Sequence, residues 1–362
     1  MIRSVLKALT AGTVCLLLST LPGAAAPFKL KGEPKIAMVL FGEKNDGGWS
    51  QAAEEARVRI EAALGLKIPV VEGVKENATA IRPVVELFIK RGHNIILGTA
   101  FGYSDTFKEL AEKYPDVAFL NLSGTTNGPN LEAVYGRTYE SQYLCGMAAG
   151  AASKTGKLGF VAANPFGVVN WTISAYELGA RKMNPNATLN VIYTGAWNDP
   201  VKERAAAQAL FEQGIDVLGQ HVDTPATQIV AQERGILGTG HHRDMRAFAP
   251  KATICSSVWT WDKFFIPEIK KVIAGTWEPG PYGAFITIKN GGTDIACCGA
   301  AVPKEAADKI MAERQAIVDG KQVFAGPLAD GSGRERVAAG QVLSDADLWK
   351  MDWFVKGVTT QK

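Results

Sequence analysis

The chain has 362 residues, 47% of them hydrophobic and 21% charged, with a formal net charge of +3. This is the composition of a globular protein, and the length suits about two domains. Because Lys and Arg are spread along the chain and form no basic stripe, we expect no nucleic-acid partner.

Residues 1–25 have the pattern of a secretory signal peptide. The basic start MIRSVLK precedes the apolar run ALTAGTVCLLLSTL and the small residues PGAAA, and cleavage is expected after Ala25. The apolar run is too short to span a hydrocarbon core of about 30 Å, which argues against a membrane anchor. We therefore expect a mature protein exported to the periplasm.

Short apolar runs then alternate with helical patterns. The runs KIAMVLF, KIPVVEG, NIILGTA and VAFLNLSG predict strands, separated by helices over about 49–63, 78–90 and 104–113. Runs this continuously apolar indicate a sheet covered by helices on both faces. The alternation predicts right-handed βαβ units and a doubly wound, mostly parallel sheet of the α/β class.

The same pattern restarts after the stretch VYGRTYESQYLCGMAAG. The runs KLGFVAA, LNVIYTG, IDVLGQ and GILGTG predict the strands of a second lobe, with helices near 170–183, 200–213 and 225–234. We expect TICSSVWTWDKFF to return as strand and helix to the first lobe. The predicted organisation is an N-terminal lobe of residues 34–138 and 259–285, a C-terminal lobe of residues 139–258 and 286–330, and a tail at 331–362 that packs on the lobes.

Four cysteines follow the signal peptide, at positions 145, 255, 297 and 298. An oxidising compartment favours a disulfide, and we expect Cys255 to pair with Cys297 or Cys298. The alternative is that all four are small buried residues, because IACCGAA is an apolar setting.

Ligands of open α/β sheets bind beyond the carboxyl ends of the strands. The stretch GEKNDGGWSQ follows the first strand and offers Asn45, Asp46 and Trp49, while YTGAWNDP offers Trp197 at the position we take as equivalent in the second lobe. Two indoles on opposite walls would hold a flat ring, each face contributing about 1–3 kcal/mol. The alternatives are that Asp46 is a helix N-cap and that GWSQA is an incomplete nucleophile turn.

Polar groups for the edge of such a ring follow the same strands. Asn45 and Asp46 are joined by Gln220 and Asp223 from GQHVDTPA. A carboxylate there accepts from an exocyclic amine or a ring N–H, although Asp223 could instead cap the helix ahead of Pro225. The further aromatic candidates for the cleft are Phe101, Tyr103, Trp171 and Trp261. The sequence has no HExxH, GxGxxG or Walker-lysine motif, so we expect no enzyme activity, cofactor or metal.

Several long stretches resemble the basic membrane protein family of periplasmic substrate-binding proteins, from about residue 35 to 259. They are NDGGWSQAAEEA, ELAEKYPDVAFLNLSG, YESQYLCGMAAGAASKTGKLGFVAA, SAYELGARKMNPNATLNVIYTGAWNDPVKERAAAQALFEQGIDVL and DMRAFAPKA. The resemblance implies a two-lobed type I periplasmic binding fold that closes on a purine nucleoside and serves an ABC transporter membrane permease. It places the family's polar and aromatic turn on Asn45, Asp46 and Trp49, and its second stacking aromatic on Trp197. We expect a monomer.

The stretch GTGHHRDM departs from that family's pattern. Aligning on DMRAFAP keeps Asp244 and puts His242, with His241 before it, where the family has an aspartate that holds sugar hydroxyls. A lysine that the family often carries falls near Thr260. Since two ribose contacts are missing together, we expect a ligand without the sugar, namely a free purine base with adenine first, near His241 and His242.

Four alternatives remain beside this hypothesis. A periplasmic ligand sensor that docks on a chemoreceptor would bind the same ligand. A purine nucleoside-binding protein would belong to the same class. An exported nucleoside hydrolase would need a cluster of acid/base groups or a metal, whereas the strand ends offer single carboxylates. A metal held by His241 and His242 would need further ligands, and neighbouring side chains in a strand point to opposite faces.

Overall fold

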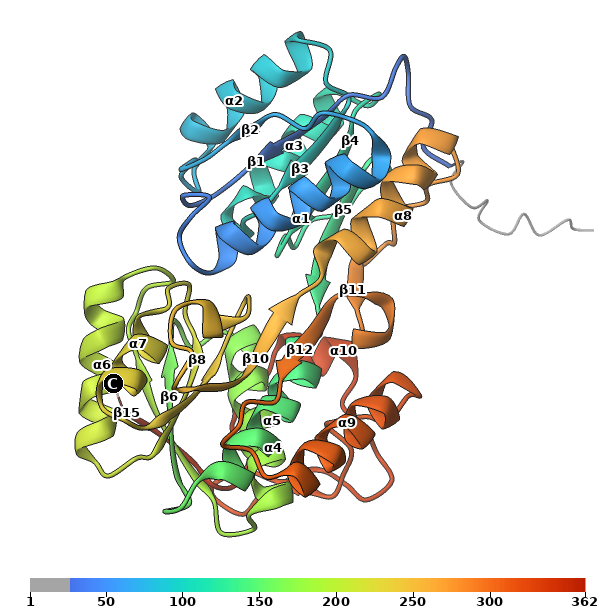
Figure 1. The fold of residues 1–362 in the computed structure, drawn as a ribbon. Coiled ribbons are helices and arrows are strands. Elements are labelled where there is room, and N and C mark those ends of the chain that lie inside the picture. Colours follow the sequence, from blue (N-terminus) through green and yellow to red (C-terminus); the bar gives the residue numbers. More distant parts are fainter. Residues whose placement is uncertain (1–26, 362) are drawn as a thin grey trace, which may run out of the picture.

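The computed structural model describes residues 27–361, so the predicted signal peptide lies outside the described part of the chain. Two main sheets, each flanked by helices, form two lobes, one above the other in Figure 1. The expected α/β fold with two mostly parallel sheets is confirmed.

The first sheet has the strand order β11-β5-β4-β3-β1-β2, and all of its neighbouring strands are parallel. Ile36 and Met38 pack in one apolar cluster with α1 and α8, whereas Ala37 and Val39 pack in another with α2 and α3. Helices therefore cover both faces, which explains the continuously apolar strands. The elements are β1 (Ile36–Val39), α1 (Trp49–Leu64), β2 (Val70–Val71), α2 (Ala78–Lys90), β3 (Ile95–Gly98), η1 (Phe101–Tyr103), α3 (Ser104–Lys113), β4 (Ala118–Leu122), β5 (Leu131–Gly136), α8 (Trp261–Ala274) and β11 (Ala284–Ile286).

The second sheet has the order β12-β10-β9-β8-β6-β7-β15, in which the β10–β12 pair is antiparallel and the other pairs are parallel. Phe160 faces the cluster that holds α4 and α5, and Val161 faces the one that holds α6 and α7. The elements are α4 (Thr138–Ala152), β6 (Lys157–Ala162), α5 (Gly167–Met183), β7 (Thr188–Tyr193), α6 (Pro200–Glu212), β8 (Val217–His221), α7 (Ala226–Glu233), β9 (Leu237–Gly240), η2 (Met245–Ala247), β10 (Thr253–Trp259), η3 (Ile288–Asn290), β12 (Thr293–Cys297), α9 (Lys304–Val318) and β15 (Val358–Gln361).

The two lobes share one winding. The order β2-β1-β3-β4-β5 in the first sheet corresponds to β7-β6-β8-β9-β10 in the second. Thus β6 is the counterpart of β1, β7 of β2, β8 of β3 and β9 of β4. In such sheets the ligand lies outside the carboxyl ends of the strands, next to the point where the winding reverses.

The chain passes between the lobes after β5, after β10 and after β11, and Figure 1 shows these segments at the junction. One prediction about this region is wrong, because the strand of TICSSVWTWDKFF does not return to the first lobe. Its strand, β10, pairs with β9 and β12 in the second sheet, and only the helix that follows, α8, packs beside α1. The boundaries predicted between the lobes stay a prediction.

The C-terminal tail spreads over the second lobe and the junction. It contains the hairpin of β13 (Leu328–Ala329) and β14 (Glu335–Val337) and the short helix α10 (Asp345–Trp349). Its last strand, β15, pairs with β7 as the edge strand of the second sheet. Ser344 and Asp347 form a capping box that fixes the start of α10.

The cysteine pairing differs from the expectation. The disulfide joins the neighbours Cys297 and Cys298, while Cys145 and Cys255 are free and buried. Cys255 does lie opposite Cys297 in the β10–β12 ladder, but its Sγ faces the Sγ of Cys145 at 3.6 Å. The predicted pairing of Cys255 with Cys297 or Cys298 is therefore wrong.

Within residues 27–361, no helix has both the length and the apolar character needed to cross a membrane.

Candidate functional site

A cavity of about 290 Å³ lies between the lobes, at the carboxyl ends of strands from both sheets. Its walls are mostly aromatic, with a few polar side chains set among them, as is usual for a small-molecule site. The lining residues are Phe41, Trp49, Glu76, Thr99, Ala100, Phe101, Ser123 and Tyr135 from the first lobe, Phe166, Gly167, Val168, Trp197, His221, Asp223 and His242 from the second, and Trp349 from the tail.

Trp49 opens α1 and is held rigidly at the cavity wall. Its Nε1–H donates to the backbone oxygen of Thr99 at 2.8 Å. The indole packs edge-on against His242, Trp259 and Trp261, with ring centroids 5.4–6.0 Å apart. These contacts hold the indole in one orientation, so that it forms a fixed apolar part of the cavity wall.

Asp46 serves the backbone of the turn before Trp49. Its carboxylate accepts from the N–H groups of Gly48, Ser50 and Gln51 at 2.8–3.0 Å, which caps the start of α1. Asn45 and Asp46 line a separate cavity of about 730 Å³ beside the first one. Both residues thus lie next to the aromatic cavity and outside its wall.

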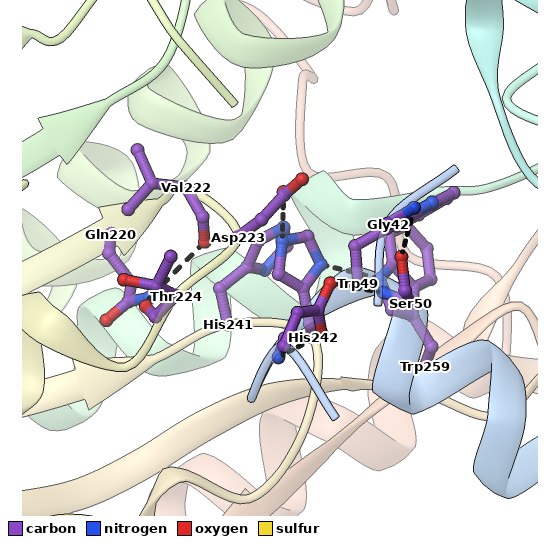
Figure 2. A network of polar contacts seen from close by, with 12 residues as sticks. Gly42, Trp49, Ser50, Gln220, Val222, Asp223, Thr224, His241, His242 and Trp259 are labelled. Atoms are coloured by element: carbon purple, nitrogen blue, oxygen red, sulfur yellow. Dashed lines mark hydrogen bonds and ion pairs between the residues drawn. The ribbon is translucent and has the colours of Figure 1, made fainter. Parts of the chain in front are cut away.

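His242 forms the centre of a hydrogen-bonded chain, shown in Figure 2. The Nε1–H of Trp259 donates to Nδ1 of His242 at 2.8 Å. An indole N–H is only a donor, so this Nδ1 carries no proton and Nε2 carries it. Nε2 then donates to Oδ1 of Asp223 at 3.0 Å.

Asp223 consequently presents one oxygen to the cavity. Its Oδ1 is taken by His242, and its Oδ2 makes no hydrogen bond within the described residues. Burial raises the pKa of the Asp223 carboxyl, and the hydrogen bond from His242 opposes that rise. A carboxylate in this position accepts an N–H or O–H from a ligand.

Two further histidines lie beside this chain as neutral rings. Burial lowers the pKa of His221 to about 3 and that of His241 well below its ordinary value. Their ring centroids are 4.4 Å apart. Nδ1 of His221 and Nε2 of His241 are buried and find no hydrogen-bond partner in the part of the chain that the structure describes. Such orphaned groups are costly. Of the two rings, that of His221 lines the cavity.

Two cavity residues have strained backbones. Ser123 has φ 56° and His242 has φ 71°, and no other non-glycine residue in the described range has a positive φ. Ser123 follows β4, and His242 follows β9, the counterpart of β4 in the second lobe. The two lobes thus have a residue with positive φ after corresponding strands. Left-handed residues of this kind gather at ligand sites, where surrounding structure holds them.

The lobes touch each other beside the cavity. A Cβ added to Gly48 of the first lobe would lie 1.8 Å from the backbone oxygen of Asp223 of the second. Nearby, Nη2 of Arg243 contacts Oε1 of Glu55 at 2.6 Å across the same edge. The structure is therefore closed along this side of the cleft.

Five predicted site residues lie behind the cavity wall. Gln220 donates to the backbone of Val222 and Thr224, Tyr103 to Val74, and Trp171 to the hydroxyl of Thr138. Trp261 stacks on Trp259, with ring centroids 4.2 Å apart, and His241 bonds Gln142. Three of them pack against wall residues: Trp261 against Trp49, His241 against His242 and Trp171 against Tyr135. The predicted residues that do line the cavity are Trp49, Phe101, Trp197, Asp223 and His242.

Trp197 is not the topological counterpart of Trp49. It follows β7, whereas β6 is the counterpart of β1, and β6 is followed by Phe166. Phe166 stacks on Phe101 of the other lobe at an interplanar angle of 15° and lies 6.0 Å from Trp197. Phe166 could have been predicted from the strand-end rule, because it comes directly after KLGFVAANP.

In residues 27–361 no three His, Cys, Asp or Glu side chains are grouped as metal ligands would be.

Two lobes of equal winding around one aromatic cavity define a two-lobed α/β fold, and solved structures share it. A crystal structure of a transcriptional activator of the comK gene from Bacillus halodurans has a TM-score of 0.71 at 22% identity, covering 80% of this chain and 99% of that chain. An ABC transporter solute-binding protein from Conexibacter woesei has a TM-score of 0.66 at 23% identity, covering 80% and 97%. The architecture is that of type I periplasmic binding proteins.

The chain belongs to the Bmp family of PnrA-like ABC transporter substrate-binding proteins, whose sequence model matches residues 33–322. It is 33% identical over 328 residues to a purine-binding protein of Brucella abortus, covering 90% of this chain and 92% of that protein. It is also 33% identical over 301 residues to a putative ABC transporter glucose-binding protein of Haloferax volcanii, covering 83% and 76%. The protein is thus the solute-binding component of an ABC transporter and is not an enzyme.

Proposed function

We propose that this protein binds a free purine base, adenine first, in the cavity between its lobes, and delivers it to the membrane permease of an ABC importer. The observation that carries the proposal is the chain from Trp259 through His242 to Asp223, which leaves one carboxylate oxygen facing an aromatic cavity. The expected signal peptide supports a periplasmic location. We propose that the protein acts there as a monomer.

The walls suit a flat, apolar ring. Trp49, Phe166 and Trp197 offer aromatic surfaces from both lobes. Stacking on aromatic side chains stabilises a bound base by about 1–3 kcal/mol for each base–aromatic contact. Several such contacts would supply a large part of the roughly 8 kcal/mol that micromolar binding requires.

The polar groups suit the edge of adenine. Oδ2 of Asp223 is an acceptor for an exocyclic amine or a ring N–H. His221 is kept neutral by burial, so it offers a ring nitrogen without a positive charge. A neutral base therefore meets both an acceptor and an uncharged partner, as adenine requires.

The cavity has little provision for sugar hydroxyls. Its other carboxylate, Glu76, has one oxygen engaged, because Oε1 accepts from the backbone N–H of Gly102 at 2.8 Å. His242 stands where the family resemblance puts a sugar-holding aspartate, and both of its ring nitrogens are engaged. Besides Oε2 of Glu76 and the hydroxyl of Ser123, the wall offers few partners for the several hydroxyls of a ribose, or of the hexose named for the Haloferax relative, and unpaired hydroxyls are costly. The similar purine-binding protein of Brucella abortus supports the purine reading.

A purine nucleoside is the second candidate, because the resemblance of long stretches to a nucleoside-binding family favours it. The test is mass spectrometry of the small molecule that leaves the purified protein on denaturation, followed by calorimetry with adenine and adenosine. We expect adenine to be released and to bind at least tenfold more tightly, about 1.4 kcal/mol. Equal affinity for adenosine would establish the nucleoside alternative, and binding of neither purine would overturn the proposal.

A further inference from the structure

The C-terminal tail brings one large aromatic side chain to the ligand cavity. The family match ends at residue 322, yet Trp349, the last residue of α10, lines the cavity. We propose that Trp349 is a ligand-contacting, specificity-determining residue that closes the cavity against purines larger than the free base. This inference rests on the proposed purine function.

The tail is fixed near the junction between the lobes, where α10 packs against α5 of the second lobe (Figure 1). The carboxylate of Asp345 pairs with both terminal nitrogens of Arg137 at 2.7 and 2.8 Å. Arg137 follows β5, where the chain first leaves the first lobe, and its Nε–H donates to the backbone of Phe285 in β11. A paired guanidinium–carboxylate contact sets orientation as well as position.

The end of α10 is also held from the second lobe. A Cβ on Gly167 would lie 2.4 Å from the backbone oxygen of Trp349, so the start of α5 and the end of α10 are in close contact. The side-chain amide of Asn170 donates to the backbone oxygen of Met351 at 2.9 Å. Trp349 therefore has little room to move away from the cavity.

The indole itself bridges the two lobes. Its ring centroid is 5.7 Å from Tyr135 of β5, 5.2 Å from Phe285 of β11 and 5.0 Å from Trp171 of α5. Leu348 and Met351 beside it are only 2% exposed, whereas Trp349 is 37% exposed. Because Trp349 lines the cavity, its indole limits the space that is left beside a bound base for a substituent such as a sugar.

The test compares three variants by calorimetry with adenine and adenosine. Trp349→Ala removes the wall, Trp349→Phe keeps an aromatic ring, and Trp353→Ala is the matched control. Trp353 lies in the same tail and stacks with Arg336, but it does not line the cavity. We expect Trp349→Ala to weaken adenine about tenfold and to reduce the preference for adenine over adenosine, with Trp349→Phe within about threefold of wild type.

Two results would overturn the inference. One is wild-type affinity and selectivity in Trp349→Ala. The other is an equal loss in Trp353→Ala, which would mean that the tail only braces the lobes. If Trp349→Ala does not fold, as judged by its thermal unfolding, Trp349→Leu takes its place with the same expected losses. The wild type is measured first: if it binds neither purine, the proposed function fails, whereas wild-type binding with an unaltered Trp349 variant overturns the inference alone.

Discussion

Gly48 of the first lobe and Asp223 of the second are in backbone contact, so close that a Cβ on Gly48 would lie 1.8 Å from the Asp223 oxygen. Asp223 also faces the cavity with its carboxylate. Asp223 thus makes the contact between the closed lobes, and it is also the residue that we propose as the hydrogen-bond acceptor for the ligand. Binding and closure should therefore depend on each other.

Gly48→Ala should keep the lobes from closing at this edge. Because a ligand gains affinity from the closed state, we expect adenine binding to weaken roughly tenfold or more, with the cleft more open in solution scattering. The control is Gly331→Ala, where an added Cβ meets nothing within 4 Å. Unchanged adenine affinity in Gly48→Ala would show that this contact has no part in binding.

Asp223→Asn should remove the acceptor while keeping the link to His242. The amide oxygen can still accept from Nε2 of His242, but the NH2 group would meet the ligand's own N–H donor. We expect a loss of about 2 kcal/mol, or roughly 30-fold, in adenine affinity by calorimetry. Asp199→Asn is the control, since Asp199 caps α6 outside the aromatic cavity and asparagine caps equally well. An Asp223→Asn protein with wild-type affinity would contradict the assigned role.

The fold followed from the sequence because strands such as KIAMVLF are apolar on both faces, and Ile36 and Ala37 indeed pack on opposite sides of their sheet. The strand-end rule also placed Trp49 and Asp223 at the cavity. The strand-end rule does not predict which of the nearby side chains point into the cavity. Trp171 follows a strand as well, yet its Nε1–H is spent on Thr138 inside the protein.

Other site residues had no local signal at all. Tyr135 lies within a strand, and Trp349 is held at the cavity by contacts distant in sequence, such as the pair of Asp345 with Arg137 more than two hundred residues away along the chain. The same holds for the cysteines. Cys255 lies opposite Cys297 across the ladder, but which sulfur it faces depends on the packing of α4, which carries Cys145.

His242→Asp should restore the group that the family resemblance assigns to sugar hydroxyls. Aspartate tolerates the positive φ of 71° at this position. We expect the ratio of adenosine to adenine affinity to rise roughly tenfold, because a ribose hydroxyl gains an acceptor and the chain to Asp223 is lost. His242→Asn, which tolerates the same backbone without adding a charge, is the matched control. If calorimetry shows an unchanged ratio of adenosine to adenine affinity, residue 242 does not determine whether the site accepts a sugar.

Glu177 should make the protein less stable as pH rises. It is buried, both carboxylate oxygens lack partners within the described residues, and burial raises its pKa to about 8. Between its ordinary value of 4.5 and about 8, the folded state holds a proton that the unfolded state has released. The free energy of unfolding therefore falls with increasing pH across this window.

Glu177→Gln should flatten that dependence, because the amide carries no charge at any pH. We expect the variant to be more stable than wild type at pH 8 by roughly 1–3 kcal/mol, and to differ less at pH 5. Burial also raises the pKa of Glu140 and Glu203 to about 7, so both proteins should lose some stability over this range. Thermal and denaturant unfolding at pH 5 and pH 8, with exposed Glu112→Gln as control, isolates the contribution of Glu177. Parallel pH profiles of wild type and Glu177→Gln would mean that this carboxyl is already neutralised or hydrated in the folded protein.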